Sequence, residues 1–140
     1  SEVQTAWSGF HLETKSNYRI FPYIYEDMGL ALRAADLVVA RSGASCLGEF
    51  PAFGLPAILV PYPYSWRYQY SNAQLLSNAG AAICIEDKDL MSDLTHMVTG
   101  LVDNISELND MSKKAKGLSK TEGSERIAEE IISMASEASR

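Results

Sequence analysis

Residues 36–73, DLVVARSGASCLGEFPAFGLPAILVPYPYSWRYQYSNA, contain the pattern that decides the fold. The run from Leu37 to Ala40 is apolar at every position, as in parallel strands that are buried on both faces. The small residues Ser42, Gly43 and Ala44 follow, and they allow the chain to turn tightly into a helix. This order of strand, turn and helix predicts an α/β fold with a parallel sheet.

The turn after this strand is also a candidate anion site. The first four N–H groups of a helix have no partner within it, and the helix dipole is positive at that end. Gly43 lacks a side chain, so a phosphate can approach the backbone closely. Glu49 lies two helical turns beyond Ser42, where its carboxylate can accept hydrogen bonds from a ribose diol. On spacing alone the pattern is weak, because small residues open many helices and an early Glu also favours the dipole.

Short apolar runs alternate with amphipathic segments along the chain, which indicates a Rossmann-like, doubly wound parallel sheet with helices on both faces. We expect strands at Val3–Trp7, Tyr18–Phe21, Leu37–Ala40 and Ala57–Val60. We expect helices at Glu26–Ala34, Ser45–Phe53, Asp89–Asn104, Ser106–Leu118 and Thr121–Ala138. The prolines and aromatic residues of Tyr62–Tyr70 predict a loop. We assign the helices after residue 88 to the scaffold.

Composition limits the class of protein. A chain of 140 residues with 46% hydrophobic residues fits one α/β domain with one core. The formal charge of −6 argues against binding to nucleic acid, which requires a basic surface. No apolar run approaches the roughly 20 residues of a membrane-spanning helix. We therefore expect a single domain that binds no nucleic acid.

The cysteines and histidines suggest neither a disulfide nor a metal site. Cys46 and Cys84 are not part of a C-x-x-C motif, and we expect two buried thiols in a reducing cytosol. His11 and His96 lie far apart in the sequence, and each is more typical of a surface or packing residue than of a metal ligand. We expect no metal and no cofactor.

The loop YPYSWRYQY, residues 62–70, follows a predicted strand, where ligands bind in open α/β sheets. Its aromatic side chains fit either stacking on a sugar or packing under the loop and against a partner, and the sequence does not decide between these. Gln69 is the better candidate for a sugar contact, because an amide offers a donor and an acceptor to adjacent hydroxyls.

Four segments, RSGASCLGE, GLPAILVPYP, RYQYSNAQLL and NAGAA, occur in this order between residues 41 and 82. Together they resemble the donor-binding C-terminal domain of the peptidoglycan UDP-GlcNAc:lipid I GlcNAc transferases. The resemblance runs from about Ile20 to the C-terminus. It implies the C-terminal lobe of a GT-B fold, in which two Rossmann-like lobes enclose the active site.

The resemblance also implies roles for individual residues. Arg41, Ser42, Gly43 and Ala44 would form the phosphate-facing turn, and Glu49 would hold the ribose hydroxyls. The backbone of Tyr25 would contact the uracil edge. Gln69 would be the second of two adjacent glutamines that hold the hydroxyls of the GlcNAc ring, and Asn72 matches the asparagine that follows; with Tyr68 they complete the donor-binding residues. Tyr68 replaces the first of two adjacent glutamines, and Tyr64 and Trp66 replace a usual histidine and acidic residue, which leaves the donor sugar open.

Two family features are not found in this sequence: the glycine-rich G-G-S-x-G-A segment and the acceptor lobe. We therefore expect residues 1–140 to be one nucleotide-sugar-binding domain, a fragment of a two-domain enzyme, with helices 88–138 completing the lobe. No catalytic residue is expected in it, and alone it should be inactive. The full enzyme would act at the cytoplasmic face of the inner membrane on a polyprenyl-linked acceptor. The alternatives are the donor subunit of a split UDP-sugar transferase and a non-catalytic nucleotide-sugar-binding or interaction module.

Overall fold

The computed structural model describes residues 5, 9, 17–65 and 67–138. Three short strands form a parallel sheet in the order β1-β2-β3: β1 (Val38–Ala40), β2 (Ala57–Leu59) and β3 (Ala82–Cys84). The two predicted strands at Leu37–Ala40 and Ala57–Val60 are confirmed, each slightly shortened. The connections between these parallel strands contain helices, as the βαβ arrangement requires.

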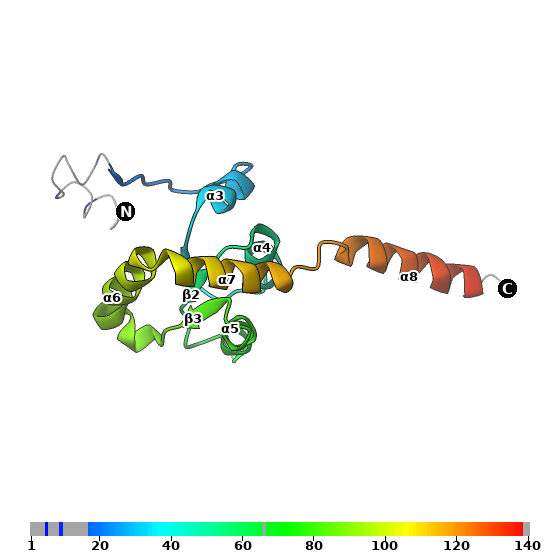
Figure 1. Cartoon of the computed structure of the whole chain (residues 1–140). Coiled ribbons are helices and arrows are strands. Elements are labelled where there is room, and N and C mark those ends of the chain that lie inside the picture. Colours follow the sequence, from blue (N-terminus) through cyan, green and yellow to red (C-terminus); the bar gives the residue numbers. More distant parts are fainter. Residues whose placement is uncertain (1–4, 6–8, 10–16, 66, 139–140) are drawn as a thin grey trace.

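Helices cover both faces of this sheet, as the alternating pattern predicted. Ala57 and Leu59 point to one face, where they pack against α4 (Cys46–Phe53) and α5 (Tyr68–Asn78). Ile58 points to the other face and packs with residues of α6 (Leu90–Asp103) and α7 (Ile105–Gly117). Successive side chains of a strand point to opposite faces, so the three residues of β2 join both halves of the core. Figure 1 shows α7 crossing in front of the sheet.

The end of α4 shows how local sequence fixes an element. Gly54 follows the helix with a left-handed backbone, φ +62°, and its N–H bonds to carbonyls of the last turn. Glycine adopts this conformation without steric cost, which explains why the helix stops there. The Ser112 hydroxyl of α7 donates to the Gly54 carbonyl at 2.7 Å. The cap of α4 is therefore also a contact between helices.

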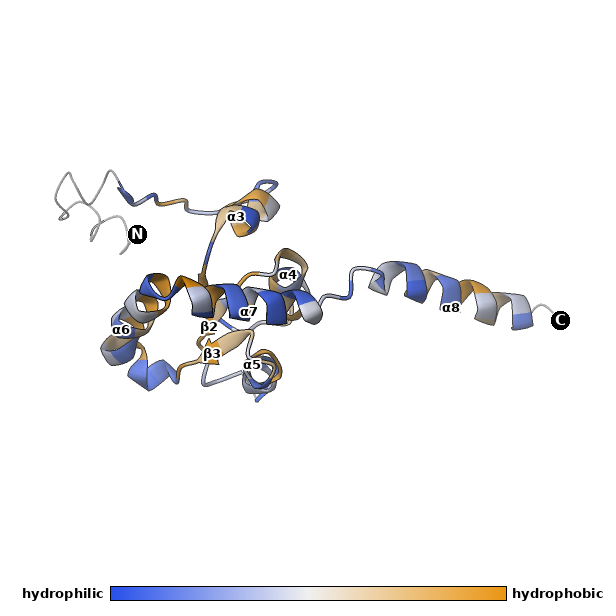
Figure 2. Cartoon of the chain, in the orientation of Figure 1, coloured by the Kyte–Doolittle hydropathy of each residue, from blue (hydrophilic) through white to orange (hydrophobic). Residues whose placement is uncertain are grey.

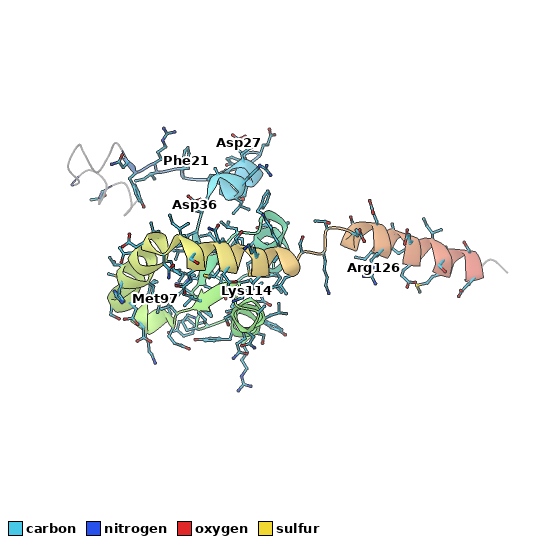
Figure 3. The ribbon with its side chains drawn as sticks, viewed as in Figure 1. Phe21, Asp27, Asp36, Met97, Lys114 and Arg126 are labelled. Atoms are coloured by element: carbon cyan, nitrogen blue, oxygen red, sulfur yellow. The ribbon has the colours of Figure 1, made fainter. Side chains whose placement is uncertain are left out.

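The segment before β1 differs from the prediction. Tyr18–Phe21 is not a strand: it is irregular chain, and the predicted Val3–Trp7 strand lies, apart from Thr5, outside the described residues. Helix α3 (Met28–Ala34) begins two residues later than expected and buries no residue fully. Figure 3 shows Phe21 and Asp27 on this segment, away from Met97 and Lys114 in the body of the molecule. A strand needs a neighbour with which to exchange hydrogen bonds, and among the described residues β1 pairs only with β2.

The later helices lie where they were predicted, with boundaries that differ by one or two residues. A 3₁₀ turn, η1 (Asp87–Asp89), precedes α6, and α5 begins at Tyr68, so the last three residues of the predicted loop Tyr62–Tyr70 are helical. Helix α8 (Gly123–Ala138) extends away from the sheet (Figure 1). Figure 2 shows polar and apolar residues on opposite sides of α8. Its large apolar side chains are 62–68% exposed and comprise Ile127, Ile131, Ile132 and Met134.

The two thiols differ in environment. Cys46 is buried as expected, whereas Cys84 is exposed, so the prediction of two buried thiols was wrong for Cys84. Cys84 is the last residue of β3, where the strand reaches the edge of the sheet. Within the described part of the chain, no helix is both long and apolar enough to span a membrane.

Candidate functional site

The turn between β1 and α4 presents backbone N–H groups at the carboxyl edge of the sheet. Cys46 N–H donates to the Gly43 carbonyl at 3.1 Å, and Leu47 N–H donates to Ala44 at 3.2 Å. These tight bonds satisfy the first amides of the helix itself, which were expected to be free. Among the described residues, no carbonyl accepts from the amides of Gly43, Ala44 or Ser45. The N–H groups available to an anion are therefore those of Gly43, Ala44 and Ser45, directly before α4.

Ser42 is a structural part of this turn. Its side chain is fully buried, with 0% exposure, and its hydroxyl donates to the Gln69 carbonyl at 2.8 Å. The Asn72 side-chain amide donates to the Ser42 carbonyl at 3.0 Å. Two hydrogen bonds thus tie the turn to the start of α5, although the segments are about 30 residues apart in the chain. Ser42 and Asn72 hold the site together through these two partly buried bonds.

Gln69 has only part of its amide available to a ligand. Its side-chain oxygen accepts a hydrogen bond from the Tyr62 N–H at 2.9 Å, whereas no group among the described residues accepts from its NH₂. Tyr68, the first residue of α5, is 75% exposed. Arg67 before it has a left-handed backbone, φ +68°, the one positive φ of a non-glycine residue in the described chain. Such backbone conformations are unfavourable and concentrate at functional sites.

Arg41 connects the chain segments that follow all three strands. Its Nη1 donates to the carbonyls of Val60 and Pro61, at 3.3 and 3.4 Å, and to the Asp87 carboxylate. The guanidinium also lies 5.5 Å from the centre of the Tyr62 ring. A cation fixed at the carboxyl edge of a parallel sheet is well placed for an anionic ligand, because ligands of open α/β sheets bind at this edge.

Glu86 and Asp87 were not among the predicted site residues. Glu86 accepts a hydrogen bond from the Tyr70 hydroxyl at 3.0 Å, and this bond, followed by burial and nearby negative charge, raises the pKa of Tyr70. Both carboxylates directly follow the apolar run that contains β3. The rule that sites form where parallel strands end would have identified them.

Glu49 and Tyr25 are not brought into direct contact with the turn. Glu49 lies in the first turn of α4 and is exposed, and its charge adds to burial in raising the pKa of the Cys46 thiol. Tyr25 is 79% exposed, and its ring centre lies 4.4 Å from that of Tyr23. It lines a hollow of about 880 Å³ beside α3. Among the described interactions, none joins Tyr25 to residues 41–44.

The structure therefore brings six of the nine predicted residues to one place: Arg41, Ser42, Gly43, Ala44, Gln69 and Asn72. Tyr68 begins the same helix, Glu49 lies further along α4, and Tyr25 lies apart. Within the described residues, no group of three or more histidine, cysteine or acidic side chains is placed to hold a metal ion. The site combines backbone amides, the Arg41 guanidinium with its partner Asp87, the side-chain amides of Gln69 and Asn72, and exposed aromatic groups.

Comparison with known protein families shows to which family the chain belongs. The model of the glycosyltransferase family 28 C-terminal domain matches residues 2–131. The chain belongs to this family. The resemblance to the peptidoglycan GlcNAc transferases is confirmed, and with it the α/β architecture of a C-terminal family 28 domain.

Individual relatives support the same assignment. A protein of Acetivibrio thermocellus is 43% identical over 122 residues, and one of Desulforamulus reducens is 42% identical over 117 residues. Both are named UDP-N-acetylglucosamine–N-acetylmuramyl-(pentapeptide) pyrophosphoryl-undecaprenol N-acetylglucosamine transferase. The matches cover 85% and 82% of this chain. The chain spans about a third of the length of these curated relatives, 33% and 31%.

The fold of the family 28 domain also matches a solved structure. The crystal structure of Acinetobacter baumannii MurG superimposes with a TM-score of 0.74 and 27% sequence identity. The similarity covers 82% of this chain and 33% of that protein. The α/β fold that was expected from short sequence patterns thus recurs in a solved structure.

Proposed function

We propose that this chain is the donor-binding lobe of an inverting glycosyltransferase that uses UDP-GlcNAc. In the complete protein, GlcNAc would be added to undecaprenyl-pyrophosphoryl-MurNAc-pentapeptide, the step from lipid I to lipid II in peptidoglycan synthesis. The observation that carries the proposal is the turn Arg41–Ala44, where a fixed guanidinium meets backbone amides that have no partner in the described part of the chain, at the carboxyl edge of the sheet. The names of the relatives point to the same donor and acceptor.

The diphosphate of the donor would bind at this turn. Amides of Gly43, Ala44 and Ser45 can donate to its oxygens, and Arg41 can balance its charge. Charge develops on the departing UDP as the bond to the sugar breaks, and fixed donors stabilise that charge without a metal ion. The protein groups of this turn would therefore act as the electrophile.

The other parts of the donor would bind around the turn. Glu49 would accept hydrogen bonds from the ribose hydroxyls, and the backbone of Tyr25 would contact uracil. The NH₂ group of Gln69 would donate to a GlcNAc hydroxyl, since its oxygen is already bonded to Tyr62. Tyr68 would contact the same ring, and Asn72 would support it by holding the turn in place. Tyr25 would have to move toward the turn when the donor binds.

The acceptor hydroxyl would attack the anomeric carbon directly, after a base removes its proton. We expect that base in the part of the complete protein outside this chain, so residues 1–140 should bind the donor without turnover. They would form a single domain that is completed by the helices in residues 88–138. The complete protein would act at the cytoplasmic face of the membrane that carries its polyprenyl-linked acceptor.

Calorimetric titration with UDP-GlcNAc and with UDP-glucose tests this proposal. We expect a preference for UDP-GlcNAc and weaker binding in Glu49→Ala. Glu129→Ala, which removes an exposed carboxylate from α8, is the matched control and should bind as the unchanged chain does. Absence of binding, or equal affinity in Glu49→Ala, would contradict the proposed donor site.

A further inference from the structure

The contacts of Arg41 differ in strength. The Val60 and Pro61 carbonyls accept from Nη1 at 3.3 and 3.4 Å, which is beyond the usual range for N–H···O hydrogen bonds. The bond to Asp87 joins two opposite charges, and such bonds are shorter and stronger than neutral ones. Asp87 is therefore the main restraint on the direction of the guanidinium.

Asp87 is itself held in place. Ile85 N–H donates to the Leu59 carbonyl of β2 at 2.9 Å, and Glu86 accepts from the Tyr70 hydroxyl of α5. Asp87 comes next and begins the turn η1, in which Asp89 N–H bonds back to the Glu86 carbonyl at 3.0 Å. The carboxylate thus stands on a segment that is fixed to both the sheet and a helix.

The remaining nitrogens of Arg41 are available to a ligand. All three hydrogen bonds described for this side chain use Nη1, and none among the described residues uses Nε or Nη2. These two N–H groups lie on one edge of the planar guanidinium and can bind two oxygens of a phosphate together. An arginine held by one nitrogen presents its other edge in a fixed direction.

We propose that Asp87 is a positioning residue of the donor site, which orients Arg41 for the diphosphate; this inference rests on the proposed function. An arginine side chain has many rotamers, and fixing it before the ligand arrives removes part of the entropy cost of binding. The carboxylate also repels the diphosphate. Since the guanidinium is bonded to Asp87 and the site is open to solvent, we expect the orienting effect to exceed this repulsion.

Titration with UDP measures the effect. We expect Asp87→Ala to weaken UDP binding by about five- to tenfold, and Asp87→Glu to retain most of the affinity because it keeps the charge-assisted bond. Asp89→Ala is the matched control: it removes the same charge from the same turn, and no bond from Arg41 to Asp89 is described. Unchanged or tighter UDP binding in Asp87→Ala would overturn the inference.

The same titrations in an Arg41→Ala background separate orientation from general damage. If Asp87 acts through Arg41, removal of Asp87 should weaken UDP binding no further once Arg41 is absent. A similar additional loss in that background would show that Asp87 acts elsewhere, and the inference would fail.

A measurement without ligand keeps this inference separate from the proposed function. Nitrogen-15 relaxation of the Arg41 Nε–Hε group reports how freely the side chain moves. We expect restricted motion in the unchanged chain and in Asp89→Ala, and free motion in Asp87→Ala. If the unchanged chain does not bind UDP, the proposed function fails while this result still decides whether Asp87 positions Arg41. Equal motion in all three proteins would overturn the positioning role.

Discussion

Ser42 links two segments that are distant in sequence through one buried hydroxyl. Its Oγ donates to the Gln69 carbonyl at 2.8 Å, and the side chain is excluded from solvent. Replacement by Ala removes this buried hydrogen bond and should cost about 1–2 kcal/mol in the free energy of unfolding. Urea unfolding measures this loss.

Ser77→Ala is the matched control for Ser42→Ala. Ser77 also donates to a backbone carbonyl of its own helix, at 3.3 Å and in an exposed position. Its replacement should change stability by no more than about 0.5 kcal/mol. Similar losses of unfolding free energy in both variants would show that the Ser42 bond does not stabilise the junction between the turn and α5.

Cys46 should react slowly with alkylating reagents. Burial, together with the charge of Glu49, raises the pKa of this thiol from 9.0 to about 11, so about a thousandth of it is thiolate at pH 8. Cys84 also has a raised pKa, through burial and Glu86, but its exposed position gives reagents access. Mass spectrometry after iodoacetamide treatment should show Cys84 modified well before Cys46. Equal rates would contradict the buried position of Cys46.

The same pKa shift predicts how stability depends on pH. Since the folded pKa of Cys46 lies above the unfolded value, its stabilising effect is complete below pH 9 and is lost as pH rises toward about 11. Compared with Cys46→Ser, the unchanged chain should lose stability more steeply in this window. Parallel curves of unfolding free energy against pH for the two proteins would contradict the shift.

Two glycines, Gly48 within α4 and Gly54 directly after it, should respond oppositely to substitution. Gly54 has φ +62°, and a Cβ there would lie 2.5 Å from the Lys116 side chain. Lys116 is flexible, so the backbone conformation dominates, and Gly54→Ala should cost about 1–2 kcal/mol. Gly48 lies inside the helix with open space around it, so Gly48→Ala should stabilise by up to about 1 kcal/mol. Thermal unfolding of both variants tests this, and a stabilising Gly54→Ala would contradict the cap.

The elements that were predicted correctly have local causes. The apolar run before Ser42, the small residues after it and the glycine after Phe53 determine β1, the turn and the end of α4 within a few residues of each other. The Tyr18–Phe21 segment has a strand-like composition, but composition supplies no pairing partner, and among the described strands none lies at the free edge of β1. Local pattern therefore predicted β1, β2 and the helix between them, but it missed β3, which was not among the expected strands.

Prediction of the candidate site was limited in the same way. The turn at Ser42–Ala44 was recognisable because its chemistry lies in consecutive residues. The bond between Arg41 and Asp87 spans 46 positions, and it exists because parallel strands bring their carboxyl ends to one edge. The fact that Gln69 uses its side-chain oxygen within its own loop was equally invisible in the sequence, since it depends on how residues 62–69 fold.

At the scale of the whole molecule, the core lies in the sheet and its four covering helices, and α8 contributes little to it. Ile58 is completely buried between the two layers, whereas Ile131 on α8 is 62% exposed. The same substitution at these two positions should therefore have very different effects. Ile58→Ala should cost about 2–5 kcal/mol, because it removes buried methyl groups and leaves a cavity. Ile131→Ala should change stability by about 0.5 kcal/mol or less.

Urea unfolding of the two variants measures both effects. Circular dichroism monitors the unfolding, which is repeated at several protein concentrations. If Ile131→Ala costs as much as Ile58→Ala, the apolar face of α8 is covered in solution. A loss that grows with protein concentration would place another copy of the chain on that face, because association stabilises a folded protein more as the concentration of its partner rises. A concentration-independent loss would mean that α8 folds back onto its own lobe. The expected small change would instead leave α8 as a separate helix whose apolar side chains do not take part in the unfolding of the core.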